Sequence, residues 1–194
     1  MPKTRRPTEL ARIARDRSAL FFRRGKEVEM TACMERLKQL LHESGANYEV
    51  RHHREVFTAQ AVAAELHEKG AGVAKVVIVW AEGQIVMLVL PAPAQVDFER
   101  VRAMVGARDV RRAREDEFKH LFPDCDVGAM PPFGNLYNVP VYMDRSLASA
   151  PDLVFEAGSH RDALKIAMAD YLRLAAPKVG TFILELHPTA ASAR

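Results

Sequence analysis

The segment Gly128–Gly134 has the composition of a stiff loop that could hold an anion. Glycine at both ends permits positive φ, and two adjacent prolines rigidify the chain between them. Proline has no N–H, so the available backbone donors are those around Gly128–Met130 and Phe133–Asn135. Such donors can bind a carboxyl, a phosphate or a developing oxyanion, although an ordinary turn would use the same residue types. The candidate binding residues here are Gly128, Ala129, Met130, Pro131, Pro132, Phe133 and Gly134.

Lys75 is the only charged residue in the otherwise apolar run Gly72–Trp80, which has the composition of a buried strand. An unpaired buried ammonium is costly, so this side chain must either reach solvent or meet an anion. One interpretation places Lys75 at an edge with its tip solvated. The other places it in a cleft, facing a phosphate or a carboxylate.

A third candidate is Gly158-Ser159-His160, which follows the predicted strand Leu153–Ala157. Small polar residues at the end of a strand can line a pocket, and they can equally form a solvent-exposed turn. The seven histidines show neither an HExxH nor a CxxC pattern, so we predict no metal and no cofactor.

The sequence contains no motif for a protein nucleophile or a nucleotide-binding loop. Patterns of the GxSxG, Walker and GxGxxG types are all missing. The two cysteines, Cys33 and Cys125, are too few for a disulfide scaffold or an all-cysteine zinc site. Cys125 precedes the glycine–proline loop, but no base is paired with it in the sequence, so we interpret it as a small packing residue.

Hydrophobic periodicity and capping residues predict alternating helices and strands in one mixed α/β (α+β) domain. A hairpin is indicated where Glu82-Gly83 separates two apolar runs. The predicted helices cover residues 32–44, 59–68, 98–105, 116–122 and 169–175. The predicted strands cover residues 47–52, 73–81, 84–90, 110–113, 139–143, 153–157 and 163–168.

Charge divides the chain into a basic N-terminal extension, residues 1–29, and a nearly neutral domain, residues 30–177, followed by a tail, residues 178–194. The extension has nine basic and four acidic side chains, while the whole chain has a net charge of +3. It is either a solvated, disordered extension or an arm that adds phosphate affinity by counterion release. No apolar run approaches the ~20 residues of a membrane helix, and no secretory signal is recognised, so we predict a cytoplasmic protein without membrane contact.

Several segments, taken together and in their order along the chain, resemble the YbaK/ProX family, whose members are aminoacyl-tRNA deacylases and editing domains of bacterial prolyl-tRNA synthetases. The resemblance extends over about residues 31–177. The segments that carry it are Thr58-Ala59-Gln60, Ala74-Lys75-Val76-Val77, Phe122–Gly128, Pro132–Leu136, Val139–Asp144 and Ala157-Gly158-Ser159-His160.

The resemblance implies a single-domain fold with a mixed, curved β-sheet flanked by helices, and hydrolysis of the ester between a wrong amino acid and tRNA. By the same resemblance, Lys75 faces the tRNA terminus and the backbone of Gly128–Pro132 binds the aminoacyl group. Gly158, Ser159 and His160 would line the same pocket, and Thr58 would begin the helix that closes its far side.

We therefore expect a site in which Lys75, Gly128 and His160 act on the ester. Lys75 would anchor the terminal phosphate, amides of the Gly128 loop would polarise the carbonyl, and His160 would orient water or substrate. The nucleophile would be water or the neighbouring ribose hydroxyl. The expected partner is the aminoacylated 3′ end of tRNA, with a synthetase as a further partner. A non-catalytic aminoacyl- or nucleotide-binding module, or a synthetase-associated regulatory module, remains the alternative.

Overall fold

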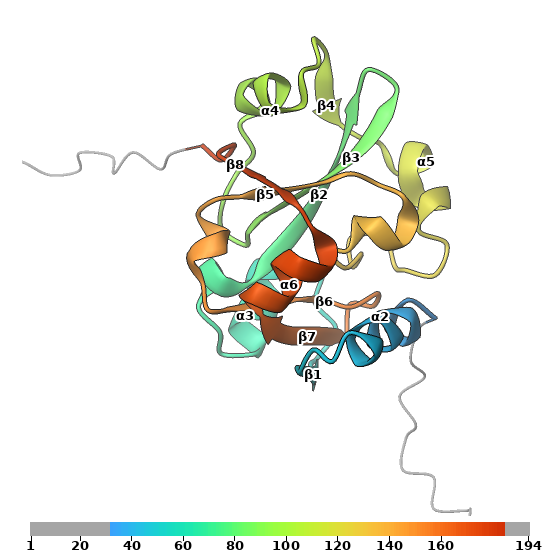
Figure 1. Cartoon of the computed structure of the whole chain (residues 1–194), viewed down its shortest axis with the longest axis vertical. Coiled ribbons are helices and arrows are strands. Elements are labelled where there is room, and N and C mark those ends of the chain that lie inside the picture. The colour runs from blue at the N-terminus through green and yellow to red at the C-terminus, as the bar shows by residue number, and fades with distance from the viewer. Residues whose placement is uncertain (1–31, 185–194) are drawn as a thin grey trace, which may run out of the picture. The chain divides into compact units, whose positions relative to one another are not determined.

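The computed structural model describes residues 32–184, in which eight strands form two sheets (Figure 1). The predicted extension 1–29 and the last ten residues lie outside the described part of the chain. The five-stranded sheet has the order β4-β2-β3-β5-β8, and the three-stranded sheet has the order β1-β7-β6. In chain order the strands are β1 Tyr48–His52, β2 Ala74–Ala81, β3 Gln84–Pro91, β4 Val110–Arg112, β5 Val141–Asp144, β6 Asp152–Glu156, β7 Asp162–Ala167 and β8 Lys178–Gly180.

The hairpin predicted around Glu82-Gly83 is confirmed and forms the centre of the larger sheet. Strands β2 and β3 pair antiparallel from Ala74 opposite Pro91 to Ala81 opposite Gln84. Both turn residues have positive φ, 47° at Glu82 and 90° at Gly83, as the tight hairpin turns that match strand twist require.

The larger sheet is mixed because β5 pairs parallel with β3 and β8 pairs parallel with β5, while β4 is antiparallel to β2. The smaller sheet is antiparallel throughout. The predicted curved sheet is therefore divided into two, linked by a parallel bridge between Val73 and Val154. That bridge brings the first residues of β2 beside β6, and this junction positions the site described below.

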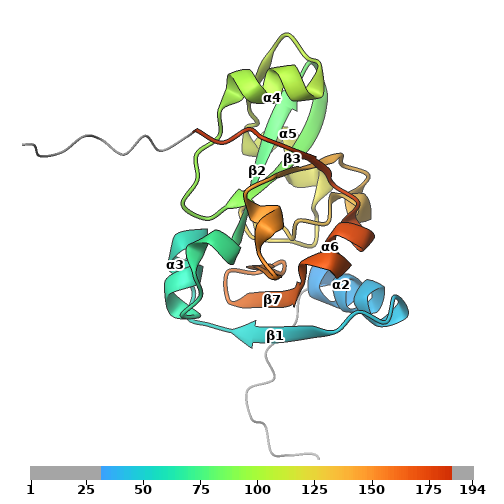
Figure 2. The same ribbon diagram turned by 60° about the vertical axis from the view of Figure 1, so that its left-hand side comes forward.

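Five α-helices accompany the sheets: α2 Ala32–Glu43, α3 Ala59–Glu65, α4 Phe98–Val105, α5 Glu115–Phe118 and α6 Met168–Ala175. Helices α2 and α6 lie next to β7, and α4 lies at the opposite end of the domain from β1 (Figures 1 and 2). Helix α4 has the predicted bounds because the Asp97 side chain caps its first turn and Gly106 ends it with a φ of 73°. Helix α3 is shorter than predicted, since His67 adopts a φ of 53°.

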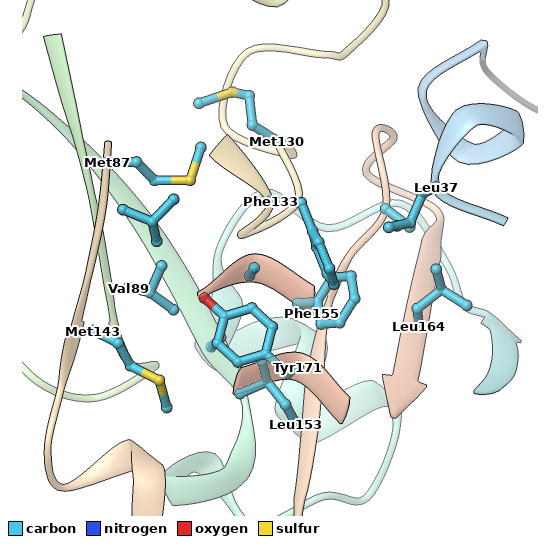
Figure 3. Close-up of a cluster of buried hydrophobic side chains, with 14 of the residues drawn as sticks. Leu37, Met87, Val89, Met130, Phe133, Met143, Leu153, Phe155, Leu164 and Tyr171 are labelled. Atoms are coloured by element: carbon cyan, nitrogen blue, oxygen red, sulfur yellow. The ribbon is translucent and has the colours of Figure 1, made fainter. Parts of the chain in front are cut away.

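The main core lies between the two sheets and helices α2 and α6. Phe133 packs against Phe155 and Tyr171, with ring centroids 5.6 and 5.4 Å apart (Figure 3). All three rings are almost fully inaccessible to solvent. Phe133 belongs to the glycine–proline loop, so the core fixes one end of the segment that was predicted to bind substrate.

The predicted domain end at residue 177 differs from the structure. Residues 178–180 form β8, and the carboxylate of Asp144 in β5 accepts a hydrogen bond from the backbone N–H of Phe182 at 2.8 Å. Phe182 is fully buried in the apolar cluster beneath α4. At least the segment 178–183 is thus part of the packed domain, because an edge strand and a buried ring hold it there.

Candidate active site

A hollow of about 270 Å³ opens where β2 approaches β6, and it brings together residues from five separate parts of the chain. Helix α3 and the residues before it form one wall, β2 another, and the loop after α5 a third. Of the predicted site residues, Thr58, Lys75, Gly128 and Met130 line it. The remaining lining residues are Phe57, Ala59, Gln60, Ala74, Val76, Val77, Arg112, Phe155 and Glu156.

Lys75 provides a positive charge without an acidic counterpart. Its ammonium has no hydrogen bond or ion pair within residues 32–184. Partial burial, together with repulsion from the nearby Arg112 guanidinium, lowers the pKa of Lys75 below its usual value. Both causes disfavour the charged form, so an anion entering the hollow would relieve an existing electrostatic cost. The interpretation of Lys75 as a residue facing a cleft is the one that this geometry favours.

The loop Asp126–Met130 is fastened to the turn between β6 and β7. The N–H of Asp126 donates to the carbonyl of Gly158 at 2.9 Å, and the N–H of Gly158 donates to the carbonyl of Ala129 at 2.9 Å. Gly128 has a φ of 98°, which few residues with a Cβ adopt. The β6–β7 turn of the three-stranded sheet thus fixes the backbone of this loop, although the loop has no secondary structure of its own.

Two amides of this loop remain available to a ligand. The N–H of Gly128 is 3.2 Å from the thioether sulfur of Met130, which is a weak acceptor that a carbonyl oxygen can replace. The N–H of Met130 has no acceptor within the described residues. Both residues line the hollow, and they belong to the first of the two groups of backbone donors that the sequence suggested. In the second group, the N–H of Phe133 donates to the Pro131 carbonyl.

His160 lies behind Gly128 rather than in the hollow. Its Nε2 is 3.1 Å from the carbonyl oxygen of Val127, and its Nδ1 is 2.9 Å from a carboxylate oxygen of Glu156. A carbonyl can only accept, so Nε2 carries a proton, and a second proton lies between Nδ1 and Glu156. Burial raises the pKa of Glu156, and the histidine contact opposes that rise. Both ring nitrogens are therefore occupied by protein partners.

The second half of the glycine–proline segment belongs to the core and not to the hollow. Pro131, Pro132, Phe133 and Gly134 are all buried, and the Pro132 carbonyl accepts a hydrogen bond from the Tyr171 hydroxyl at 3.0 Å. A Cβ on Gly134 would lie 2.4 Å from the Val139 carbonyl oxygen. These residues hold the loop in place without lining the hollow, and the same is true of the buried Ala129.

Gly158 and Ser159 also lie outside the lining of the hollow. The Ser159 hydroxyl donates to the buried carboxylate of Asp162, and the same carboxylate contacts Nδ1 of His52. In this cluster the acid lies between the serine and the histidine, so no histidine can activate the serine as a nucleophile. Its observable role is to fix the β6–β7 turn that holds the loop.

Sequence reasoning did not find four of the lining residues that matter for chemistry: Phe57, Gln60, Arg112 and Glu156. Phe57 is 71% exposed, and its ring meets the edge of His160 at a centroid distance of 4.8 Å. An exposed phenylalanine directly before the Thr58 cap was the available signal for that residue. Arg112 and Glu156 had no local signal, because only strand pairing brings them to the junction.

Two other hollows contain none of the predicted site residues. The larger, about 710 Å³, lies beside Trp80, Glu117 and Tyr137. Glu117 there has a pKa lowered to about 2 by the bidentate Arg111 guanidinium, so its charge is already balanced. The other, about 470 Å³, is lined by Lys165, which is paired with Glu68 and Asp152. The hollow at the sheet junction differs because its lysine, Lys75, has no acidic partner within residues 32–184, while its one acid, Glu156, is bonded to His160.

Within residues 32–184, no three side chains of the His, Cys, Asp or Glu types gather as a metal ion would require. No helix in the same part of the chain is both long and apolar enough to span a bilayer. Three lining residues have side chains of nucleophilic type: Thr58, Lys75 and Glu156. Thr58 Oγ1 accepts a hydrogen bond from the Ala61 N–H at 3.2 Å as the helix cap, and a carboxylate oxygen of Glu156 is bonded to His160 Nδ1 at 2.9 Å. Any hydrolysis here would use a nucleophile that the substrate or solvent brings.

Comparison with known proteins gives one consistent result. The sequence model of a family described as "Aminoacyl-tRNA editing domain" matches residues 53–174. The chain is 30% identical over 154 residues to the "Multifunctional Ser/Thr-tRNA deacylase ProXp-y" of Escherichia coli strain K12, which covers 76% of this chain and 91% of that protein.

Two solved structures share the fold at low sequence identity. A crystal structure provisionally described as a trans-editing enzyme for prolyl tRNA synthetase has a TM-score of 0.70 and 19% identity, covering 80% of this chain and 99% of that one. The crystal structure of hypothetical protein APE2540 has a TM-score of 0.69 and 20% identity, covering 76% of this chain and 99% of that one. At such identities they support the fold alone.

Proposed function

The chain belongs to the aminoacyl-tRNA editing domain family, and we propose that its junction hollow hydrolyses the ester of mischarged tRNA. The observation that carries this proposal is the sharing of one hollow by the unpaired Lys75 ammonium and the amides of Gly128 and Met130. A cation and backbone donors that line one hollow suit a substrate with a phosphate next to an ester.

In this proposal Lys75 binds a phosphate of the tRNA terminus, with Arg112 at the same wall as a second cation. The N–H groups of Gly128 and Met130 bind the ester carbonyl and stabilise the oxyanion that forms when the ester is attacked. The attacking group is water or the adjacent ribose hydroxyl, since no lining side chain is an activated nucleophile.

We assign His160 the role of a positioning residue and not of a base. With Nε2 bonded to the Val127 carbonyl, its ring supports the residue that directly precedes Gly128. Glu156 in turn fixes the ring orientation. The contact of the ring with Gly128 is close, since a Cβ there would lie 3.3 Å from His160 Cε1.

For the amino acid, we propose the small polar side chains serine and threonine as the first candidates. The E. coli relative is named for those two, and a hollow of about 270 Å³ must also admit part of the terminal adenosine. Met130 and Phe155 form its apolar wall, and one methylene in such a wall changes discrimination by only about 1–3 kcal/mol. A synthetase that produces the mischarged tRNA is the natural further partner in this proposal.

The decisive experiment is a deacylation panel with tRNAs carrying serine, threonine, alanine and cysteine, using wild type and Lys75→Ala. Loss of a charge-assisted contact of about 1.5–3 kcal/mol lowers kcat/KM roughly 10- to 100-fold. Lys119→Ala, which removes an exposed lysine outside the hollow, is the matched control and should leave the rate unchanged. Activity of Lys75→Ala within twofold of wild type would remove the assignment. Saturable binding without hydrolysis of any tRNA would favour a binding module instead.

A further inference from the structure

The two cysteines of the chain meet in the folded domain, although 92 positions separate them in the sequence. Cys33 lies in the first turn of α2, and Cys125 lies in the segment that leads to the Gly128 loop. Their Sγ atoms are 2.8 Å apart. Cys33 is fully buried, while Cys125 is partly exposed. The pair therefore has one closed side and one side that a small solute can reach.

Polar groups surround the two sulfurs, unlike the apolar setting of an inert packing cysteine. The Tyr137 hydroxyl is 3.1 Å from Cys125 Sγ, 3.2 Å from Cys33 Sγ and 3.0 Å from a carboxylate oxygen of Asp124. The guanidinium of Arg36 pairs with Asp124 at 3.5 Å and lies 4.7 Å above the Tyr137 ring. Helix α2 thus contributes both a thiol and a cation to this cluster.

The two thiols cannot be treated as independent groups. The hydrogen bond from Cys125 is the main cause that lowers the pKa of Cys33, against the effect of burial, and Tyr137 adds to it. The pKa of Cys125 is raised, first by its bond to Cys33 and then by burial. Removing one proton from the pair is therefore easier than removing two, and the remaining proton lies between the sulfurs.

We propose that Cys33 and Cys125 form a two-electron redox site that closes to an intramolecular disulfide when a hydroperoxide reaches it. A disulfide needs a sulfur separation of about 2.05 Å, so the sulfurs must approach by roughly 0.8 Å. The site is separate from the proposed deacylation chemistry, because neither cysteine lines the junction hollow.

The reaction balances with the hydroperoxide as the oxidant. The shared proton first moves from Cys125 to Cys33 along their hydrogen bond, so that the exposed Cys125 sulfur attacks one peroxide oxygen as the thiolate. An S–O bond forms as the O–O bond breaks, and the departing oxygen leaves as water or alcohol after taking a proton from solvent. The Cys33 sulfur then attacks the sulfenic sulfur, forming the S–S bond, while the S–O bond breaks and hydroxide leaves as water with the shared proton. The two sulfurs lose two electrons, and the peroxide gains them.

Closing this bond would connect α2 covalently to the wall of the junction hollow. Cys125 is followed directly by Asp126, whose N–H donates to the carbonyl of Gly158. Gly128 lies two residues after Asp126. In the reduced protein that connection consists of the thiol contact, the Tyr137 hydroxyl and the Arg36–Asp124 pair. In a reducing compartment the two thiols persist, and a disulfide between them would form only transiently before it is reduced again.

The test uses the full chain, treated with a small excess of hydrogen peroxide at neutral pH. We expect the two titratable thiols to disappear together, the mass to fall by two hydrogen atoms, and a Cys33–Cys125 cross-linked peptide to appear in a non-reducing digest. The melting temperature should rise by about 5–15 °C, because the bond closes a long loop, and dithiothreitol should reverse the rise. Tyr137→Phe keeps both thiols and should form the same disulfide several-fold more slowly.

Cys33→Ser is the matched control. It should give oxygen adducts on Cys125 and no rise in melting temperature. The proposal fails if wild type keeps both thiols under peroxide, if it gives oxygen adducts without the cross-link, or if it forms disulfide-linked dimers instead. Each readout is independent of deacylation, so failure here leaves the proposed function standing.

Discussion

The two halves of the glycine–proline segment each contain a glycine, and they have different tasks. Gly128 and Met130 line the hollow, whereas residues 131–134 are buried beside it. Gly128 is needed for its φ of 98°, while Gly134 is needed because Val139 leaves no room for a Cβ. The difference shows that loop residues which line a site can be held rigidly when the residues that follow them in the chain are packed in the core.

The strongest test of this comparison is Gly134→Ala. The new Cβ would lie 2.4 Å from a backbone oxygen that cannot move alone, so we expect the free energy of unfolding to fall by about 3 kcal/mol or more. Denaturant titration measures it. Gly72→Ala is the control, since its Cβ would make only an ordinary contact at 3.8 Å and should cost below about 0.5 kcal/mol. An equal loss in both variants would contradict the steric role of Gly134.

Gly128→Ala should separate stability from activity. Positive φ costs an alanine about 1–2 kcal/mol, and the Cβ also presses on His160, so deacylation should fall at least tenfold in protein that remains folded. Gly106→Ala has a similar positive φ with nothing within 4 Å of its Cβ. It should lose comparable stability in denaturant titration and keep its kcat/KM. If Gly128→Ala keeps its rate too, the loop wall is not part of the site.

Glu156→Gln tests the contact of Glu156 with His160, the residue that supports the Gly128 loop, through the pH dependence of stability. Because burial raises the pKa of Glu156 in the folded state, its protonated form contributes stability that is complete below the unfolded value of ~4.3 and is lost as pH rises through the folded value. Glutamine stays neutral and can still donate to His160 Nδ1. The variant should therefore gain stability relative to wild type between pH 4 and pH 7, as measured by unfolding at each pH.

A constant stability difference between Glu156→Gln and wild type over that pH range would contradict the assignment. Glu156→Ala provides the complementary control. It leaves a ring nitrogen of His160 without its partner and should cost about 1–3 kcal/mol.

The smallest effect on stability is expected for Phe57→Ala, at the rim of the hollow. The ring is 71% exposed, so the free energy of unfolding should change by less than about 0.5 kcal/mol. If the ring contacts the tRNA end, KM should rise several-fold with kcat unchanged, and steady-state deacylation measures both. An unchanged KM would show that Phe57 does not contact the substrate.

Much of the local structure could be predicted because its causes are local. The β2–β3 hairpin follows from two apolar runs around Glu82-Gly83, and α4 follows from its cap at Asp97 and its stop at Gly106. The division into two sheets and the strand β8 could not be predicted in this way. Both depend on pairing between distant segments, such as Val73 with Val154 and Tyr142 with Lys178.

By itself the sequence determined which residue types were available for chemistry: one lysine in an apolar strand, one stiff loop and no nucleophile motif. Only the tertiary structure decided which of them meet. It placed Lys75 and Gly128 on one hollow, directed Phe133 and Gly134 into the core, engaged both nitrogens of His160, and brought Cys33 beside Cys125. The physical reason is that strand register and core packing act between residues far apart in the chain, while composition and turn signals act within a few positions.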